Sequence, residues 1–254
     1  MVPADGSQIL ENENIYLIIF MKPKRYKHLF FDLDRTLWDF DSSALHTFER
    51  LFETYKLYDF GVADLDIFYQ TYNEHNDKLW TEYRNGNLQK EVLRDLRFRK
   101  TLKAFDIDNE KLVRQLSHDY LYFSPRTVYL FPHTIEVLEF LKKDYKLYLI
   151  TNGFEEVQHI KINEAGINGF FEKMITSEAA GVKKPDPLIF SYAMQQCNTL
   201  KADSLMIGDD LPVDILGAQA FGMDQVFFNP QKQQHTESPT YEISSLIELK
   251  DILA

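Results

Sequence analysis

The stretch His28-Leu-Phe-Phe-Asp32-Leu-Asp34-Arg-Thr36 decides the fold expected for this chain. The apolar run over 27–33 has the length and composition of a buried β-strand. Two carboxylates, Asp32 and Asp34, lie at its C-terminal end, where open α/β sheets bind their ligands. On its own the pattern is also that of an Asp-capped turn, so the ends of the other strands must decide its role.

Four further short runs that are apolar or rich in β-branched residues predict strands at 146–151, 173–177, 204–208 and 225–228. Helical segments separate these runs at 155–165, 186–197 and 212–221. Each helical segment has the length of one crossover between parallel strands. We therefore expect an α/β fold, a parallel sheet with helices on both faces, and a last amphipathic helix over 244–253.

The chain between Asp34 and Thr151 is much too long for a single crossover. Apolar residues within it recur at helical spacing, with polar breaks between them. We interpret residues 40–126 as an inserted all-helical domain of about four helices. A helix over 133–143 then returns the chain to the sheet. The core domain is expected to comprise the ranges 21–39 and 127–254.

The composition of the 254-residue chain, 44% hydrophobic and 26% charged, is that of a globular protein. A net charge of −11 argues against binding to nucleic acid or to an anionic membrane surface. The single cysteine, Cys197, excludes an intrachain disulfide and a cysteine zinc site, which favours a reducing cytoplasm. We expect a cytoplasmic protein, a monomer or a homodimer, without nucleic-acid or membrane partners.

The apolar run over 15–21 is too short to cross a bilayer. Acidic residues precede it and no small-residue cleavage site follows, so a signal peptide is not expected. We expect residues 1–20 to form a poorly ordered extension, with Met21 as an alternative start.

Polar groups follow three later strands at the same position as the first two carboxylates. They are Thr151-Asn152-Gly153, the Lys184 segment Gly181-Val-Lys-Lys-Pro-Asp-Pro187, and Gly208-Asp209-Asp210 with Asp214 one helical turn beyond. Alone, each has an ordinary structural interpretation, namely a turn, a solvated lysine or a helix cap. Because the C-terminal ends of parallel strands share one edge of the sheet, we expect all of them to converge.

Convergence at that edge would create two neighbouring binding features. Carboxylates from the first and fourth strands would form an all-oxygen site suited to Mg²⁺. Thr151, backbone N–H groups and Lys184 would form an anion cradle beside it. A carboxylate, a hard cation and an anion cradle in one crevice suit phosphoryl transfer.

The ordered set DLDRT, TNG, GVKKPDP and GDDLPVD resembles the four motifs of the haloacid dehalogenase (HAD) superfamily, over residues 27–230. The inserted helices lie between the first and second motifs, as in members with a helical C1 cap on a Rossmann-like core. Further stretches resemble the pyrimidine 5′-nucleotidase (YjjG-type) branch, at 79–86, 93–98, 150–154, 177–181 and 214–217.

The resemblance implies a role for each motif residue. Asp32 would be the nucleophile, Asp34 the general acid and base, and Lys184 a catalytic group that also binds phosphate. Thr151 and the Asn152 N–H would hold the other phosphoryl oxygens. The Mg²⁺ ligands it implies are Asp32, the Asp34 carbonyl, Asp209 and, in support, Asp214; the adjacent Asp210 leaves the direct ligand from this motif open.

The second acid separates two chemistries of the superfamily. Its dehalogenases lack an acid two residues after the nucleophile, so the presence of Asp34 disfavours dehalogenation. The resemblance thus implies a Mg²⁺-dependent phosphomonoester hydrolase, with a small-molecule phosphomonoester as its partner and a pyrimidine nucleoside 5′-monophosphate as the leading substrate.

Three aromatic side chains are candidates for contact with the substrate. Trp38 and Phe40 follow the catalytic loop and should reach its mouth, and Phe154 follows the second motif. A flat apolar wall there could stack a nucleobase, although a sugar phosphate could use the same wall. The alternatives are a sugar-phosphate phosphatase or phosphomutase of the same fold, and a non-enzymatic phosphate- or nucleotide-sensing module.

Overall fold

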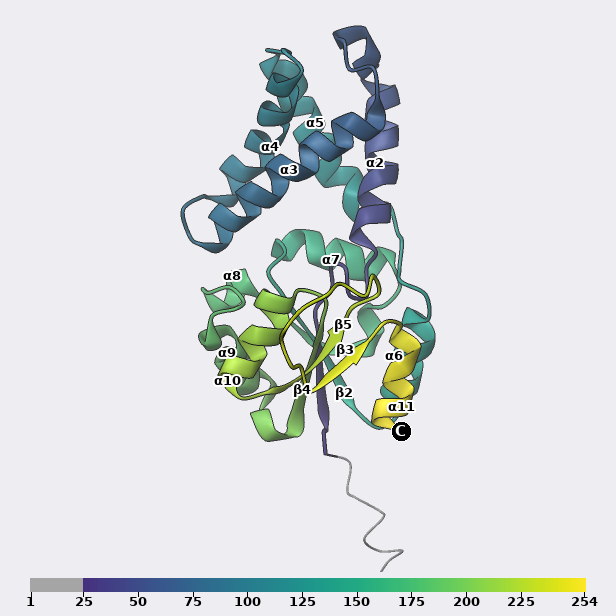
Figure 1. The fold of residues 1–254 in the computed structure, drawn as a ribbon, viewed down its shortest axis with the longest axis vertical. Helices are drawn as coiled ribbons and strands as arrows, with labels where there is room; N and C mark the ends of the chain where they lie inside the picture. The colour runs from purple at the N-terminus through teal and green to yellow at the C-terminus, as the bar shows by residue number, and fades with distance from the viewer. Residues whose placement is uncertain (1–24) are drawn as a thin grey trace, which may run out of the picture.

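The computed structural model describes residues 25–254 and centres on one six-stranded parallel sheet (Figure 1). Its strands lie in the order β3-β2-β1-β4-β5-β6. Their bounds are β1 (His28–Phe31), β2 (Lys146–Thr151), β3 (Phe171–Thr176), β4 (Ser204–Gly208), β5 (Asp224–Phe228) and β6 (Tyr241–Ile243). The predicted α/β class and the first five strands are confirmed. The short strand β6, which has three residues and extends the sheet beside β5, was not predicted.

The first strand lies in the middle of the sheet, between β2 and β4. Phe31 at its end pairs with Leu149 on one side and with Ile207 on the other. The Asp32 N–H continues this ladder by donating to the Ile207 carbonyl at 2.9 Å. The chain passes from β1 to β2 and β3 on one side, and then crosses to β4 on the other side of β1. The loops after β1, β2 and β4 therefore surround one crevice.

Helices cover both faces of the sheet because side chains alternate along its strands. Leu29 and Phe31 belong to a hydrophobic cluster with α6 and α11, whereas Phe30 belongs to a second cluster with α9 and α10. The helices packed around the sheet are α6 (Thr134–Leu141), α7 (Glu155–Glu164), α8 (Ser177–Ala180), α9 (Pro187–Cys197), α10 (Leu216–Phe221) and α11 (Leu249–Leu253). Short helical turns are η1 (Leu57–Phe60), η2 (Ser124–Arg126), η3 (Asn168–Phe170), η4 (Lys201–Asp203), η5 (Leu211–Ile215) and η6 (Leu246–Glu248).

Four long helices lie above the carboxyl edge of the sheet (Figure 1). They are α2 (Phe40–Thr54), α3 (Leu65–Arg84), α4 (Lys90–Ala104) and α5 (Glu110–Phe123), as the periodicity predicts. They bury their own aromatic cluster, which includes Phe48, Tyr72, Phe98 and Tyr120. We call these four helices the cap. This cluster is separate from the two clusters on the sheet, which fits the predicted inserted domain. The limits of that domain at 40 and 126 stay a prediction.

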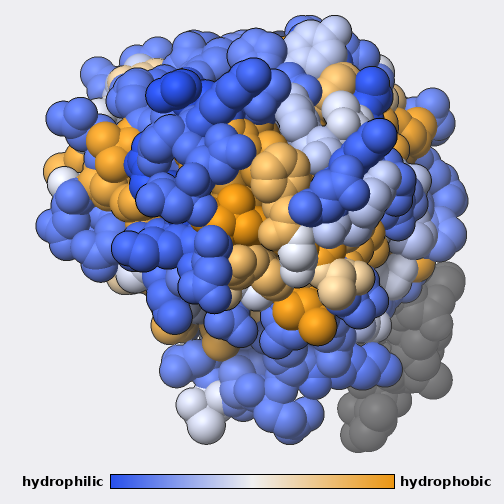
Figure 2. Space-filling model, turned by 90° about the horizontal axis from the view of Figure 1, so that it is seen from above, coloured by the Kyte–Doolittle hydropathy of each residue, from blue (hydrophilic) through white to orange (hydrophobic). Residues whose placement is uncertain are grey.

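The outer end of the cap is mainly hydrophilic. Seen from above, hydrophilic side chains make up most of this face, and apolar side chains are exposed in its middle and toward its edges (Figure 2). Within residues 25–254, no helix is long and apolar enough to cross a membrane. The predicted N-terminal extension, 1–20, lies outside the described residues.

Candidate active site

The loop after β1 turns back on itself and directs two carboxylates into a cavity. The N–H groups of Leu37 and Trp38 both donate to the Leu33 carbonyl, at 3.0 and 2.8 Å. Arg35 takes a left-handed conformation, with φ of 63°, which tightens this turn. The side chains of Asp32 and Asp34 therefore line one cavity of about 180 Å³.

The predicted position of Trp38, which follows this turn, is wrong. Trp38 does not reach the mouth of the site: it is fully buried within the cluster on one face of the sheet and does not line the cavity. The turn holds the Trp38 N–H against the Leu33 carbonyl, and the indole packs with Leu33 and Leu37 in that cluster instead of lining the cavity. Phe40 and Phe154 do line the cavity, as expected.

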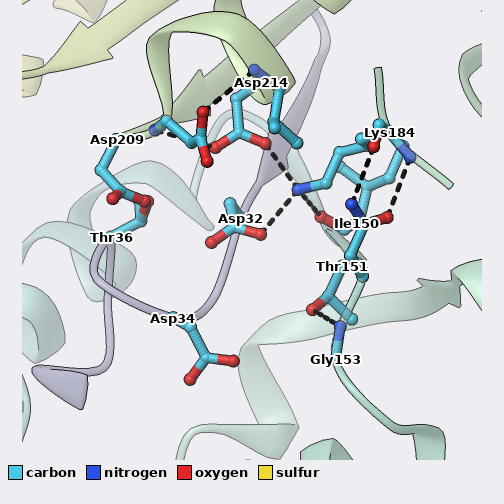
Figure 3. A network of polar contacts seen from close by, with 12 residues as sticks. Asp32, Asp34, Thr36, Ile150, Thr151, Gly153, Lys184, Asp209 and Asp214 are labelled. Atoms are coloured by element: carbon cyan, nitrogen blue, oxygen red, sulfur yellow. Dashed lines mark hydrogen bonds and ion pairs between the residues drawn. The ribbon is translucent and has the colours of Figure 1, made fainter. Parts of the chain in front are cut away.

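Lys184 links two of the predicted acids at the centre of the site (Figure 3). Its Nζ lies 2.6 Å from Asp32 Oδ1 and 2.7 Å from Asp214 Oδ1, and it donates to the Ile150 carbonyl at 2.7 Å. These partners match the three protons of an ammonium group. Burial disfavours its charge, but the carboxylates of Asp214 and Asp32 outweigh burial and raise the pKa of Lys184.

Asn152 fixes the lysine in place. Its side-chain amide donates to the Lys184 carbonyl and accepts from the Lys184 N–H, both at 2.9 Å. Only the backbone N–H of Asn152 was predicted to belong to the site. The side chain adds a link between the loop after β2 and the loop that precedes α9.

Three carboxylates approach one another at the crevice between β1 and β4. Oxygens of Asp32, Asp209 and Asp214 all lie within 4.8 Å of one another. The Thr36 hydroxyl donates to Asp209 at 3.0 Å (Figure 3). Asp210 instead accepts from the Val213 N–H at 3.0 Å and caps η5. The structure thus brings Asp209 and Asp214, rather than Asp210, to Asp32.

The concentration of acidic groups in this cluster favours the binding of a cation. Burial raises the pKa of Asp32 to about 7, opposed by Lys184 and reinforced by Asp214 and Asp34. Burial together with Asp32 and Asp214 raises the pKa of Asp209 well above its ordinary value. One ammonium group does not balance three carboxylates, and an all-oxygen donor set suits a hard divalent ion. The residues present therefore fit Mg²⁺.

We expect Mg²⁺ to stabilise the protein most at alkaline pH. Carboxyl pKa values that are higher in the folded protein than in the unfolded chain mean that the unfolded chain loses its protons first as the pH rises. The metal-free protein should therefore lose stability between about pH 4 and pH 8 through these groups. At pH 8, Mg²⁺ at 100 times its Kd should raise Tm by roughly 5–10 °C.

Differential scanning calorimetry with and without Mg²⁺, at pH 5 and pH 8, measures both effects. NaCl at matched ionic strength is the control. A Mg²⁺ shift at pH 8 no larger than the NaCl shift would contradict the expectation.

Two side chains of α7 hold Asp34 from the opposite side. Gln158 Nε2 donates to Asp34 Oδ2 at 2.9 Å and to the Thr151 hydroxyl oxygen at 2.7 Å. Lys161 Nζ, almost fully buried, forms an ion pair with Asp34 Oδ1. Neither residue was predicted. The available signal is their i, i+3 spacing, which puts both on one face of the helix after the second motif.

Thr151 is left with a free proton to donate. Its hydroxyl oxygen accepts from Gln158 Nε2 and, at 3.0 Å, from the Gly153 N–H (Figure 3). A hydroxyl has two acceptor sites and one donor, so both acceptor sites are used. The remaining O–H can donate to an anionic oxygen, in agreement with the predicted phosphate cradle.

We expect Gly208→Ala to damage the acid cluster. A Cβ on Gly208 would lie 2.6 Å from the Asp214 Cβ, so Asp214 would have to move away from Lys184. Overpacking of this kind costs about 1–3 kcal/mol of unfolding free energy. Urea unfolding and hydrolysis rates measure the two effects.

The control is Gly169→Ala, because a Cβ there meets nothing within 4 Å. Equal effects of the two substitutions would mean that the close approach of Asp214 does not matter.

The cap forms the roof of the cavity. Asn76, Trp80 and Arg84 come from α3, Arg97 from α4 and Tyr120 from α5. Phe154, from the core, stacks on Trp80 with ring centres 5.1 Å apart.

Ion pairs also join the cap to the core beside the cavity. Lys90 contacts Glu178 at 2.7 Å and Glu156 at 3.4 Å, and Arg94 pairs with Glu156. The cavity therefore has a core floor that carries the acids and a cap roof that carries aromatic and polar groups.

The model of the haloacid dehalogenase-like hydrolase family matches residues 29–228 of this chain. The chain belongs to this family. Its membership confirms the resemblance seen in the four motifs and makes the protein a HAD-type hydrolase. The members of the family compared below also cover the cap.

Two curated relatives are pyrimidine 5′-nucleotidases by name. YjjG of Escherichia coli is 30% identical over 90% of this chain and 98% of its own length, and PynA of Streptococcus pneumoniae is 33% identical over 90% and 95%. A glyceraldehyde 3-phosphate phosphatase of Pyrococcus furiosus is 32% identical over 91% and 94%. The predicted resemblance to the YjjG-type branch is confirmed.

A solved structure of the HAD family resembles the whole described fold. The crystal structure of YfnB from Bacillus subtilis, bound to magnesium, superposes with a TM-score of 0.80 and 29% identity, over 91% of this chain and 99% of that one.

Proposed function

We propose that this protein is a Mg²⁺-dependent phosphomonoester hydrolase that acts on pyrimidine nucleoside 5′-monophosphates. One observation carries the hydrolysis of esters: the carboxylate of Asp34 lines the same cavity as Asp32, where it can serve an oxygen leaving group. The nucleotide preference is supported by PynA and YjjG, whose similarity extends over the helices that line the cavity.

In the first half of the proposed reaction, an oxygen of Asp32 attacks the phosphorus of the substrate. A P–O bond to Asp32 forms as the ester P–O bond breaks, and the departing alkoxide takes a proton from Asp34. The products are the free nucleoside and an aspartyl-phosphate. Thr151, through its free O–H, and the Asn152 N–H donate to the phosphoryl oxygens.

In the second half, water attacks the phosphorus of the aspartyl-phosphate. Asp34, now a carboxylate, takes a proton from that water, and the P–O bond to Asp32 breaks. Phosphate leaves, Asp32 is again a carboxylate and Asp34 is again protonated. Gln158 and Lys161 position Asp34 for both steps through the contacts described above.

The residues that would hold Mg²⁺ are Asp32, the backbone carbonyl of Asp34, and Asp209, with Asp214 in support through Lys184. When bound, the ion supplies positive charge that offsets the repulsion between Asp32 and an anionic phosphate. The magnesium-bound structure of the relative YfnB supports this assignment.

The cap helices, within the proposed domain 40–126, would exclude water and select the leaving group. Phe40, Trp80 and Phe154 offer flat surfaces on which a base can stack. A sugar-phosphate phosphatase is the second candidate, because the relative from Pyrococcus furiosus aligns over an equal share of the chain. A monomeric or homodimeric state and a cytoplasmic location stay predictions.

The test is phosphate release from nucleoside monophosphates and sugar phosphates, with Mg²⁺ and with EDTA. We expect Mg²⁺-dependent release that is fastest for pyrimidine monophosphates. Faster release from sugar phosphates would exclude the nucleotidase assignment and retain the hydrolase. A bisphosphate product from a sugar phosphate would instead indicate a phosphomutase.

A further inference from the structure

We infer that Arg97 and Asn76 form a recognition site in the cap for the polar edge of the substrate's pyrimidine base. This inference rests on the proposed function and deepens it, since it assigns the choice of leaving group to two side chains. Both residues line the cavity that contains Asp32 and Asp34, and they come from neighbouring helices, α4 and α3.

Arg97 is a buried cation with an unused donor. Its residue is 4% exposed, and within residues 25–254 its terminal Nη2 has no hydrogen-bond partner and its guanidinium has no ion-pair partner. Its Nε donates to the Arg94 carbonyl at 3.3 Å, which leaves the outer part of the fork free. A buried unpaired donor on a charged group costs stability, so a ligand that supplies an acceptor would recover that cost.

Asn76, in the lining of the same cavity, shows the same feature. The residue is 3% exposed, and its Oδ1 has no partner among the described residues. A side-chain amide carries both donors and an acceptor. Arg97 and Asn76 together can thus bind a group that presents a carbonyl oxygen next to a ring nitrogen, which is the edge common to pyrimidine bases.

The surroundings favour a flat neutral group over a second phosphate. The Arg97 guanidinium lies over the Tyr120 ring at 4.6 Å, which fixes its plane. The cap groups that line the cavity with it include a second cation, Arg84, the acidic Asp77, and the neutral Trp80, Tyr120 and Leu121. A base can use the donors, the Asn76 acceptor and the aromatic walls, whereas a phosphate dianion can use only the donors.

The experiment compares two substrates that share the phosphate and differ in the base. Uridine 5′-monophosphate carries the edge that the two residues would bind, and ribose 5-phosphate lacks it. We expect Arg97→Met to lower kcat/KM for uridine 5′-monophosphate about 10- to 100-fold, and Asn76→Ala to lower it about 2- to 10-fold. For ribose 5-phosphate, we expect both variants to stay within about threefold of the parent.

Stability supplies a readout that separates binding from a structural role. Removing a buried unpaired charge should leave Tm unchanged or raise it, whereas loss of a structural arginine would lower it. The matched control is Arg114→Met, an exposed arginine of α5 that does not line the cavity. This control substitution should change kcat/KM for neither substrate.

Equal losses on both substrates, or no loss on either, would overturn the recognition site and leave the nucleotidase assignment standing. The parent protein tests that assignment separately. If it releases phosphate fastest from ribose 5-phosphate, the nucleotidase assignment fails, and the base-recognition site fails with it.

Discussion

Asp32→Asn should reduce phosphate release from every substrate by about 10⁴-fold or more, as expected when a covalent nucleophile is removed. The amide has nearly the shape of the carboxylate but no charge, and it is a poor nucleophile toward phosphorus. It also leaves Lys184 with one charged partner, Asp214, in place of two. Steady-state assays measure the rate, and acid-quenched protein analysed by intact mass reports the aspartyl-phosphate, which should be absent from the variant.

Asp186→Asn is the matched control. This substitution makes the same change from carboxylate to amide, but at an exposed helix cap. Asp186 accepts from the Leu188 N–H at 2.9 Å, and asparagine caps a helix equally well. Its activity should therefore match that of the parent. Release that survives in Asp32→Asn and is equally sensitive to EDTA would mean that another group attacks the phosphorus.

The fold and the convergence of the acids follow from local patterns and one topological rule. Apolar runs separated by helical periodicity define β1 to β5, and the ends of parallel strands share an edge. That rule brings Asp32, Lys184, Asp209 and Asp214 together from three loops, after β1, β3 and β4, as their ion pairs and close approach show. β6 was missed because three residues are too few to show a period.

Side chains that act through tertiary contacts were not predictable in the same way. Gln158 and Lys161 look like ordinary polar residues of a surface helix, and only the packing of α7 over the site turns them toward Asp34. Trp38 was placed wrongly because its position next to the loop says nothing about which side of the turn its ring occupies. Arg97 is distinguished only by its burial, which the sequence does not display.

Asp34→Asn should reveal whether Asp34 acts as the general acid, because its effect should depend on the leaving group. A nucleoside leaves as a basic alkoxide, so loss of the proton donor should lower the rate of its release about 10²- to 10⁴-fold. The p-nitrophenolate ion needs no proton to leave, so the first half-reaction with p-nitrophenyl phosphate should lose far less. Single-turnover experiments with excess enzyme isolate this step and measure both losses.

The second half-reaction provides an independent test of proton transfer by Asp34. Water attack on the aspartyl-phosphate also uses Asp34, as a base, so the variant should accumulate phosphorylated Asp32 when p-nitrophenyl phosphate is the substrate. Gln158→Glu is a useful companion, because it retains the size of the side chain but replaces a donor to Asp34 by an acceptor. It should slow nucleotide hydrolysis less than Asp34→Asn. Equal losses of Asp34→Asn with both leaving groups, without trapped phosphoenzyme, would show that Asp34 serves the site through Lys161 and Gln158 alone and moves no proton.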